Sequence, residues 1–475
     1  MAERYVSETQ LARLIRVPPD ARPYYRALAE AVRNLILDGR LPVRVRIPPE
    51  RRLADALGVS RTTVTTAYDR LREQGYLQSR QGAGSWTALP DAGALGTDSL
   101  WIAPDDDGLL PLHVAAPPAT ALLGEAVEEA GRTYHRYALG MGYEPLGLAV
   151  LREAIARRYR ERGLPTRSDQ IMVTAGAQHA MHLLLTMLAG PGDPVLLESP
   201  TYPHAIDAVR LRGARLVPVG IPEDGRHVDL TISAMRQSAA RLGYVIPDFH
   251  NPTGHLMPDE DRAALVAAAR RHGATLLADE SWAELAVDPV ATAAPLAAFD
   301  TDDRVICIGS AAKLWWGGLR VGWIRAAPGV LRRLAVLRGA VDIAGPVFEQ
   351  LVVAYLFDRI EEARAERRRV FGASRSALVE ALREELPAWT FTVPRGGGSL
   401  WVRLDSPTAG AVAEAAASRG VRLAPGPWFG VDGTLERYLR LPFTQPPDVV
   451  REAVRRIATG PAGTYRPREP LIHAL

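Results

Sequence analysis

Apolar side chains recur at helical spacing in three short segments near the start of the chain. Residues 23–38 place their apolar side chains on one stripe, which predicts a first helix that ends at a glycine. Two prolines open a second predicted helix over 48–57, and Ser60 is a natural N-cap for a third helix over 61–74. Only residues 58–60 separate the second and third helices, which is the length of turn that a helix-turn-helix requires.

Two runs with strand-like composition follow these helices. Residues 76–80 (YLQSR) and 85–88 (SWTA) are joined through a glycine-containing turn, which predicts a two-stranded wing. In a winged helix-turn-helix, the N-terminal residues of the third helix face base edges in the major groove, and other contacts go to phosphates. We therefore expect DNA contacts from Arg51, Arg61, Thr62, Thr63, Thr65, Gln81 and Gly82.

From about residue 112 the pattern changes to apolar runs that alternate with helical segments. The runs QIMVTAG, PVLLES, RLVPVG, YVIPDF, ATLLADE and RVICIGS predict an α/β domain with a mostly parallel sheet. A terminal segment, roughly 365–460, predicts a smaller α+β lobe. Residues 89–111 are rich in Gly, Asp and Pro, and we expect a flexible linker that lets the two domains move semi-independently. The predicted domains are therefore a head over 1–88 and a body over 112–465.

Composition supports this division and narrows the class of protein. A chain of 475 residues is too long for one hydrophobic core, and 47% hydrophobic with 23% charged residues is typical of a globular protein. The first residues lack the layout of a signal peptide, and no apolar run is long enough to span a bilayer. The single cysteine, Cys307, lies in an apolar run, which predicts a core residue and excludes an internal disulfide. We expect a cytoplasmic protein without a membrane partner or a metal site.

The net charge of +3 conceals an asymmetry between the two predicted domains. Residues 1–90 contain 15 Arg against 9 acidic residues, a surplus of +6, so the remaining 385 residues carry −3. A basic head on a mildly acidic body indicates that the head meets a polyanion, and the predicted helix-turn-helix makes double-stranded operator DNA the expected partner.

One lysine stands out among the basic residues. Of the 57 basic residues 56 are arginine, and the single lysine is Lys313. A guanidinium stays protonated at any usable pH and cannot form a Schiff base, whereas a lysine amine can be deprotonated by its surroundings. Lys313 is therefore a candidate for chemistry that requires an amine.

Four motifs in the body carry further candidate chemistry. TAGAQ (174–178) lies at a strand end before a helix, where backbone N–H groups and the helix dipole favour a phosphate. HNPTG and ADES offer the Asn251 amide and the Asp279 carboxylate at two other strand ends. GSAAKLWWGGLRVGW places Ser310 three residues before the lysine and Arg320 seven residues after it. Together they supply what pyridoxal 5′-phosphate (PLP) requires: an amine, an acid opposite the ring nitrogen, and phosphate ligands.

The run PPERRLADALGVSRTTVTTAYDRLREQGYLQSRQGAGSW resembles the DNA-binding domain of the GntR family over nearly its full length. The order of helices, their spacing and the turn residues all agree. The resemblance implies that Arg51, Arg61, Thr62, Thr63, Thr65 and Gly82 are DNA contacts.

Roughly residues 112–460 resemble fold-type I PLP enzymes of the aspartate aminotransferase class. The resemblance implies that Lys313 forms the Schiff base, that Asp279 keeps the pyridine nitrogen protonated, and that Asn251 bonds the 3′-oxygen. Tyr202 would stack on the ring. Arg440, in LRLPF, would clamp the α-carboxylate of an amino acid bidentately.

The same resemblance assigns the phosphate site and a contribution from a second subunit. Tyr137 would reach the phosphate of the neighbouring subunit, because sites of this family form at a dimer interface. The residues implied around the phosphate are Gly176, Ala177, Ser310 and Arg320, with Gln178 beside them in the cofactor site.

The sequence departs from the family pattern at two places. A tyrosine usually follows the ring-nitrogen aspartate by two or three residues, and here those positions are Ser281 and Trp282. The hydrogen bond from that tyrosine to the 3′-oxygen is therefore lost or altered. Position 204 is histidine, where GABA-responsive relatives use a second arginine, so we expect His204 to contact an effector other than GABA.

A GntR-type head followed by an aminotransferase-like body resembles the MocR (GabR-like) subfamily of regulators over essentially the whole chain. This resemblance implies a homodimer, arranged head-to-tail, in which an amino acid or amine displaces Lys313 from the aldimine and alters how the two heads are held. Three alternatives stay open: a working aminotransferase with an accessory DNA-binding head, a body that has lost PLP, and a regulator for which PLP is itself the effector.

Overall fold

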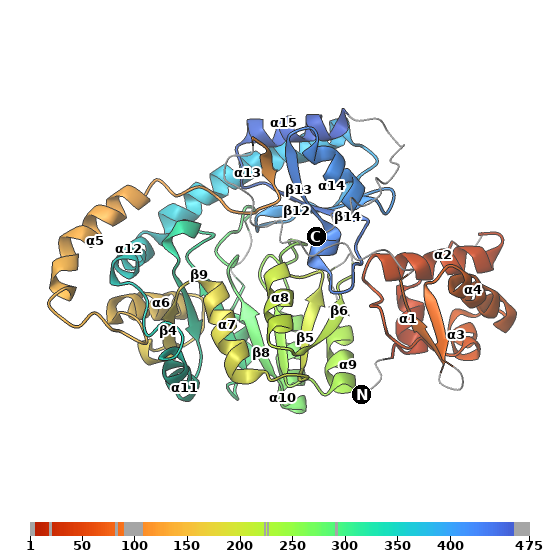
Figure 1. Ribbon diagram of the computed structural model, residues 1–475, viewed down its shortest axis with the longest axis horizontal. Coiled ribbons are helices and arrows are strands. Elements are labelled where there is room, and N and C mark those ends of the chain that lie inside the picture. Colours follow the sequence, from red (N-terminus) through yellow and green to blue (C-terminus); the bar gives the residue numbers. More distant parts are fainter. Residues whose placement is uncertain are drawn as a thin grey trace, which may run out of the picture.

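The chain folds into a small head and a larger two-lobed body, which lie side by side in Figure 1. The structure is a computed structural model, and it describes residues 5–18, 21–80, 84–89, 108–222, 225, 228–289 and 293–459. None of the helices in these ranges combines the length and the apolar character needed to cross a membrane.

The head contains the three predicted helices and the two-stranded wing, preceded by one further helix. Its elements are α1 (Glu8–Leu14), α2 (Tyr24–Leu37), α3 (Glu50–Leu57), α4 (Arg61–Glu73), β1 (Leu77–Arg80) and β2 (Gly84–Thr87). Sequence periodicity missed α1 because it has only seven residues, but Ser7 and Gln10 form a capping box at its start. Ser60 caps α4 as predicted, with its hydroxyl accepting from the backbone N–H of Thr63 at 3.1 Å.

A seven-stranded sheet forms the centre of the body, and it is mostly parallel, as the sequence predicts. Its spatial order is β4-β10-β9-β8-β7-β5-β6, and β10 alone runs antiparallel to its neighbours. The strands are β4 (Ile171–Thr174), β5 (Pro194–Ser199), β6 (Arg215–Gly220), β7 (Leu242–Val245), β8 (Thr275–Asp279), β9 (Val305–Ser310) and β10 (Gly322–Arg325). The first six correspond to the six apolar runs. Cys307 is fully buried in β9, so its prediction as a core residue is confirmed.

Helices cover this sheet and extend away from it. They are α5 (Leu123–Tyr137), α6 (Ala149–Glu161), α7 (Ala177–Leu188), α8 (Pro203–Leu211), α9 (Val228–Ser238), α10 (Asp259–His272), α11 (Pro328–Arg338), α12 (Val347–Asp358) and α13 (Ile360–Glu385). Figure 1 shows α5 at the end of the molecule opposite the head, and α13 running from the large lobe into the small one.

The small lobe is α+β, as predicted, and contains a five-stranded sheet of order β11-β12-β14-β13-β3. Its elements are β11 (Thr390–Phe391), β12 (Ser399–Arg403), β13 (Val421–Pro425), β14 (Tyr438–Pro442), α14 (Ala409–Ala417), α15 (Pro447–Ala458) and β3 (Leu110–Leu112). The short apolar run of β3 pairs in parallel with β13. Residues 110–111, which the sequence assigns to the linker, therefore belong to the body, and residues 90–107 lie outside the described part.

The head is packed against the body by backbone contacts at the end of α2. The Leu435 N–H donates to the Leu37 carbonyl at 2.6 Å. Gly220, at the end of β6, approaches the head so closely that a Cβ there would lie 2.6 Å from the Gly39 carbonyl oxygen. Semi-independent motion of the two domains, as expected from the linker composition, would require these contacts to break.

Candidate cofactor site and DNA-binding surface

The candidate cofactor residues converge at the carboxyl ends of the parallel strands. Asp279 ends β8 and Ser310 ends β9, while Gly176 caps α7 immediately after β4. Side chains at this edge of a parallel sheet lie near one another because the strands end at a common crevice. The small lobe adds Arg440 from the middle of β14.

Lys313 lies among these residues, at the carboxyl ends of the parallel strands, and is partly buried. Its Nζ donates to the Ala115 carbonyl at 2.9 Å and lies 5.1 Å from the centroid of the Trp282 ring. Burial, and then the positive charge of Arg440, lowers the pKa of the Lys313 amine to about 8, against an opposing effect of Asp279. A substantial fraction of the amine is therefore unprotonated near neutral pH, which is the form that attacks a carbonyl carbon.

Asp279 is a buried carboxylate with a hydrogen bond on each oxygen. The Tyr244 hydroxyl donates to Oδ2 at 2.7 Å, and the backbone N–H of Ser281 donates to Oδ1 at 2.9 Å. Asp279 is 8% exposed and Tyr244 is 2% exposed. These donors fix the orientation of the carboxylate, as an acid opposite a pyridinium nitrogen requires.

The predicted phosphate ligands form a cradle at the start of α7. Gly176 has φ = 91°, and a Cβ there would lie 2.9 Å from Nη2 of Arg320, so this position needs glycine for both conformation and space. Arg320 also donates to the Ala175 carbonyl at 3.3 Å. Gln178, in the first turn of α7, has a buried Oε1 without a hydrogen-bond partner among the described residues. A guanidinium beside a helix N-terminus suits a dianionic phosphate.

Ser310 and Ala177 complete the phosphate side of the site. Ser310 Oγ accepts from the Ala312 N–H at 3.1 Å, which fixes the hydroxyl on the turn that leads to Lys313. Ala177 is the first residue of α7. The four residues predicted around the phosphate, Gly176, Ala177, Ser310 and Arg320, thus lie at the start of α7, at the end of β9 and in the turn before β10.

Arg440 is 3% exposed and lies between the two lobes. One of its Nη atoms donates to Oδ1 of Asn251 at 3.3 Å, the other donates to the His113 carbonyl, and the guanidinium lies 4.9 Å from the Phe429 ring centroid. Burial lowers the pKa of Arg440 to about 10, so the group remains a cation at neutral pH. A buried cation beside the candidate amine is suited to a carboxylate ligand.

Tyr202 and His204 lie at the start of α8, and both are partly buried. Their rings pack edge to face with centroids 5.3 Å apart. Burial, and then the charge of Asp279, raises the pKa of Tyr202 above its usual range, so it stays a neutral phenol. His204 Nδ1 lies 3.6 Å from Oδ2 of Asp207. Tyr202 therefore shares the electrostatic environment of the candidate ring site, and His204 lies beside it.

Tyr137 stands apart from the residues above. It is the last residue of α5 and packs on the main core, and within the described part of the chain no hydrogen bond joins it to the phosphate cradle. This placement leaves its predicted role, at the site of a second subunit, untested.

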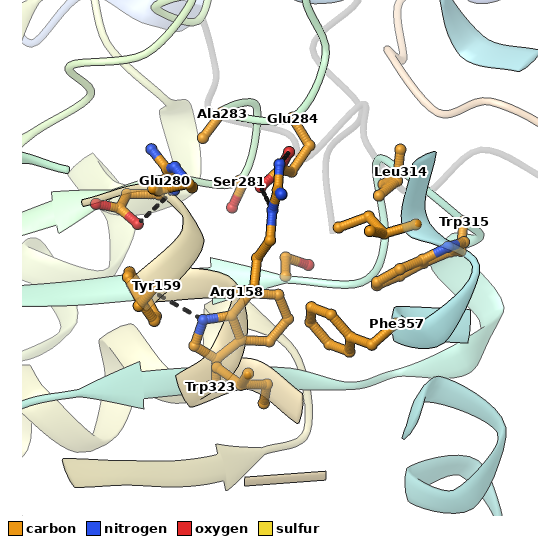
Figure 2. A pocket seen from close by; sticks show the side chains of 14 residues that line it. Arg158, Tyr159, Glu280, Ser281, Ala283, Glu284, Leu314, Trp315, Trp323 and Phe357 are labelled. Carbon is orange, nitrogen blue, oxygen red and sulfur yellow. Dashed lines mark hydrogen bonds and ion pairs between the residues drawn. The ribbon is translucent and has the colours of Figure 1, made fainter. Parts of the chain in front are cut away.

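An aromatic pocket lies beside the turn that follows Asp279 (Figure 2). The Phe357 ring packs edge to face on Trp315 and Trp323, with centroids 4.9 and 5.6 Å apart. At its polar side Arg158 donates to both oxygens of Glu284, at 2.8 and 2.6 Å. Because these charges neutralise each other, we assign the pocket a structural role in supporting the turn.

The predicted DNA contacts that the structure describes lie on α3 and α4. Arg51, Arg61 and Thr62 are exposed. Thr63 shares a hydrogen bond with the Ser60 hydroxyl at 2.8 Å, and the Thr65 hydroxyl donates to the Arg61 carbonyl at 3.1 Å. Both threonine hydroxyls are therefore already engaged within the helix. Gln81 and Gly82 lie outside the described residues.

Sequence reasoning missed four contributors to the candidate site. The Ala115 carbonyl and the backbone of His113 carry no sequence signal, since they act through main-chain oxygens. Burial, and then Arg440, lowers the pKa of His113 to about 4, so its ring is neutral. Tyr244 lies in an apolar strand and resembles an ordinary core residue. The sequence marks Trp282 only as a position where the family usually has tyrosine, and it does not predict that the Trp282 ring lies against the Lys313 amine.

Comparisons with known proteins match both parts of the chain. Residues 114–457 match the family described as aminotransferase class I and II, and residues 24–86 match bacterial regulatory proteins of the gntR family. The probable rhizopine catabolism regulatory protein MocR of Rhizobium meliloti is 31% identical over 396 residues, covering 77% of this chain and 78% of MocR. Aromatic-amino-acid aminotransferase 1 of Thermococcus litoralis is 30% identical over 354 residues, covering 71% of this chain and 83% of that enzyme.

A solved structure matches the body. LysN, an α-aminoadipate aminotransferase of Thermus thermophilus solved in complex with N-(5′-phosphopyridoxyl)-L-leucine, superposes with a TM-score of 0.68 at 30% identity. The match covers 74% of this chain and 92% of LysN. The predicted fold-type I architecture is therefore confirmed.

Proposed function

Since this chain belongs to the class I and II aminotransferases and carries a gntR-family head, as MocR-type regulators do, we propose that it senses an amino acid or amine and adjusts DNA binding accordingly. The chain is a DNA-binding regulator with an aminotransferase-like body. Such a regulator works in the cytoplasm, where it meets operator DNA.

PLP is the cofactor of this domain, and when bound it supplies a carbonyl carbon for an amine and a ring that acts as an electron sink. Lys313 provides the resident amine, and Asp279 holds the proton on the ring nitrogen. The cradle of Gly176, Ala177, Gln178, Ser310 and Arg320 binds the phosphate. Asn251 would bond the 3′-oxygen and Tyr202 would stack on the ring.

An effector that carries an amine would compete with the Lys313 amine for the cofactor, while Arg440 would bind the effector carboxylate and His204 would contact its side chain. The pKa of Lys313, about 8, favours this exchange because the amine that leaves and returns is easily deprotonated. The guanidinium of Arg440 is buried and remains a cation at neutral pH, which favours ligands that bring a carboxylate. The effector class is therefore an α-amino acid.

The single observation that carries a sensing role is the connection from Arg440 to the head. Arg440 lies on β14, and the residues just before that strand contact α2 of the head. Leu435 donates its N–H to Leu37. Arg437 Nη2 lies 3.4 Å from Asn34 Oδ1, and Arg437 Nε lies 3.9 Å from Asp38 Oδ1. An effector that repositions Arg440 would act on a strand directly attached to the DNA-binding domain.

We further propose a homodimer, formed through α5 and the loop after it. Leu139 and Met141 are 90% and 91% exposed, and Tyr134 and Tyr143 lie beside them with exposed rings. An apolar surface of this kind marks an interface. Because α5 lies opposite the head (Figure 1), a two-fold dimer through this face would hold the two heads at opposite ends of the assembly. The head-to-tail arrangement and the contact of Tyr137 with the partner's phosphate site stay predictions of the family resemblance.

The testing experiment combines cofactor trapping with DNA binding. Purified protein with PLP is reduced with borohydride and mapped by peptide mass, which should place the cofactor on Lys313, the only lysine. Operator affinity is then measured with and without individual amino acids. A change in affinity without turnover of a keto acid supports the regulator. Sustained transamination with unchanged DNA affinity would instead support a working aminotransferase with an accessory head, and a response to PLP alone would make PLP the effector.

A further inference from the structure

A buried tyrosine that no role above requires lies behind the candidate ring site. Tyr244 belongs to β7, which pairs in parallel with β8, the strand that Asp279 ends. Its hydroxyl donates to Oδ2 of Asp279 at 2.7 Å. Tyr244 is 2% exposed, so solvent cannot supply a substitute donor. The contact joins two groups that are 35 residues apart in sequence.

Each carboxylate oxygen of Asp279 accepts one hydrogen bond from the protein. Oδ2 accepts from Tyr244, and Oδ1 accepts from the Ser281 N–H at 2.9 Å. Two donors on fixed backbone elements hold the carboxylate in one orientation. Burial, and then the charge of Asp279, raises the pKa of Tyr244 well above its usual value, so Tyr244 remains a donor at every working pH.

We propose that Tyr244 is a positioning residue, which orients the Asp279 carboxylate and keeps the proton shared with PLP on the ring nitrogen rather than on the carboxylate. This inference rests on the proposed function, in that Asp279 must face the ring nitrogen. Loss of the phenol would remove one donor from the carboxylate and would shift the shared proton from the nitrogen towards a carboxylate oxygen. No atom is gained or lost in that shift.

The test compares Tyr244→Phe with a matched control. Tyr159→Phe also removes a buried hydroxyl, one that accepts from Trp323 Nε1 at 3.3 Å within the aromatic pocket (Figure 2). Each full-length variant is loaded with PLP labelled with ¹⁵N in the ring, and the ring-nitrogen resonance is followed from acid to alkaline pH. The dissociation constant for PLP is measured in parallel.

We expect Tyr244→Phe to move the ring-nitrogen resonance at neutral pH from the pyridinium position towards that of a neutral pyridine. PLP should bind about ten-fold more weakly, since one hydrogen bond to a charged group is lost. Tyr159→Phe should leave both quantities at the wild-type values. In an Asp279→Asn background, the phenylalanine change should have no further effect on the resonance, because the acceptor carboxylate is absent.

Three outcomes would overturn the inference. These are a wild-type resonance in Tyr244→Phe, equal shifts in both tyrosine variants, and an undiminished effect of the phenylalanine in the Asp279→Asn background. If Tyr244→Phe does not fold, a wild-type resonance in folded Tyr244→Leu, which has no donor, would also overturn it. Failure of the proposed function is distinguishable, because the wild-type protein itself would then hold no PLP on Lys313.

Discussion

Arg437 and Arg440 lie three positions apart and face two different parts of the molecule. Arg437 Nη2 lies 3.4 Å from Asn34 Oδ1 of the head, while the Arg440 guanidinium is buried beside Asn251 in the candidate site. A β-strand is stiff along its length, and Tyr438–Pro442 is hydrogen-bonded on both sides, to β12 and β13. A displacement of Arg440 would therefore be passed along this strand towards the head. Strand β14 thus links the candidate effector site at Arg440 to the DNA-binding head, and allostery requires two linked sites of this kind.

Arg437→Ala should weaken the link between effector and operator without removing either binding event. The head loses its contacts with Asn34 and Asp38, but Arg440 keeps its own partners. We expect the ratio of operator affinities with and without amino acid, commonly about 5–150-fold in allosteric proteins, to fall towards one. Arg451→Ala is the control, because Arg451 pairs with Glu380 and not with the head. An unchanged ratio in Arg437→Ala would show that the coupling takes another route.

Gly220→Ala should separate the head from the body while leaving the cofactor site intact. The added Cβ would lie 2.6 Å from the Gly39 carbonyl oxygen, and a backbone atom cannot move aside as a side chain can. We expect a larger radius of gyration by small-angle X-ray scattering and a normal PLP spectrum. Gly329→Ala is the control, since the nearest atom to its Cβ is 3.8 Å away. Wild-type scattering from Gly220→Ala would contradict the docked arrangement.

Most of the fold and half of the site follow from local sequence signals. Asp279 and Ser310 could be predicted because strand ends of a parallel sheet converge, and Gly176 because a helix start follows a strand. The contact of Tyr244 with Asp279 could not be predicted. It depends on the register between strands β7 and β8, which the pattern of hydrophobic residues in the sequence does not determine. The docking of the head was also unpredictable, because Leu435 is distant in sequence from the head and carries no polar signal.

Lys313→Arg should abolish covalent retention of PLP and preserve the fold. Arginine keeps the positive charge and the length of the side chain, but its guanidinium does not act as a nucleophilic amine. After borohydride reduction we expect no cofactor on any peptide, because the chain has no other lysine. DNA binding by the head without effector should match that of the wild type. Cofactor trapped in Lys313→Arg would overturn the assignment of this residue.

The pKa of Lys313, about 8, predicts how PLP loading depends on pH. Below pH 8 the ammonium form dominates and cannot attack the aldehyde, and above pH 8 the amine dominates. The rate of loading by stopped-flow absorbance should therefore rise roughly ten-fold for each pH unit below about 8 and level off above it. A lysine with an ordinary pKa of about 10.4 would instead give a rate that is still rising at about pH 9. That result would mean that burial does not tune this amine.

Arg61→Ala should remove specific recognition of the operator and spare PLP binding. Arg61 is the first residue of α4 and exposed, so its guanidinium is free to reach a guanine edge in the major groove. Loss of one bidentate base contact costs about 1–3 kcal/mol, or roughly 5–150-fold in specific affinity, and binding to unrelated DNA should change much less. Arg70→Ala, in the last turn of the same helix, is the control for net charge. Equal losses on operator and unrelated DNA would place Arg61 on a phosphate instead, and the salt dependence of binding would then fall by about one counterion.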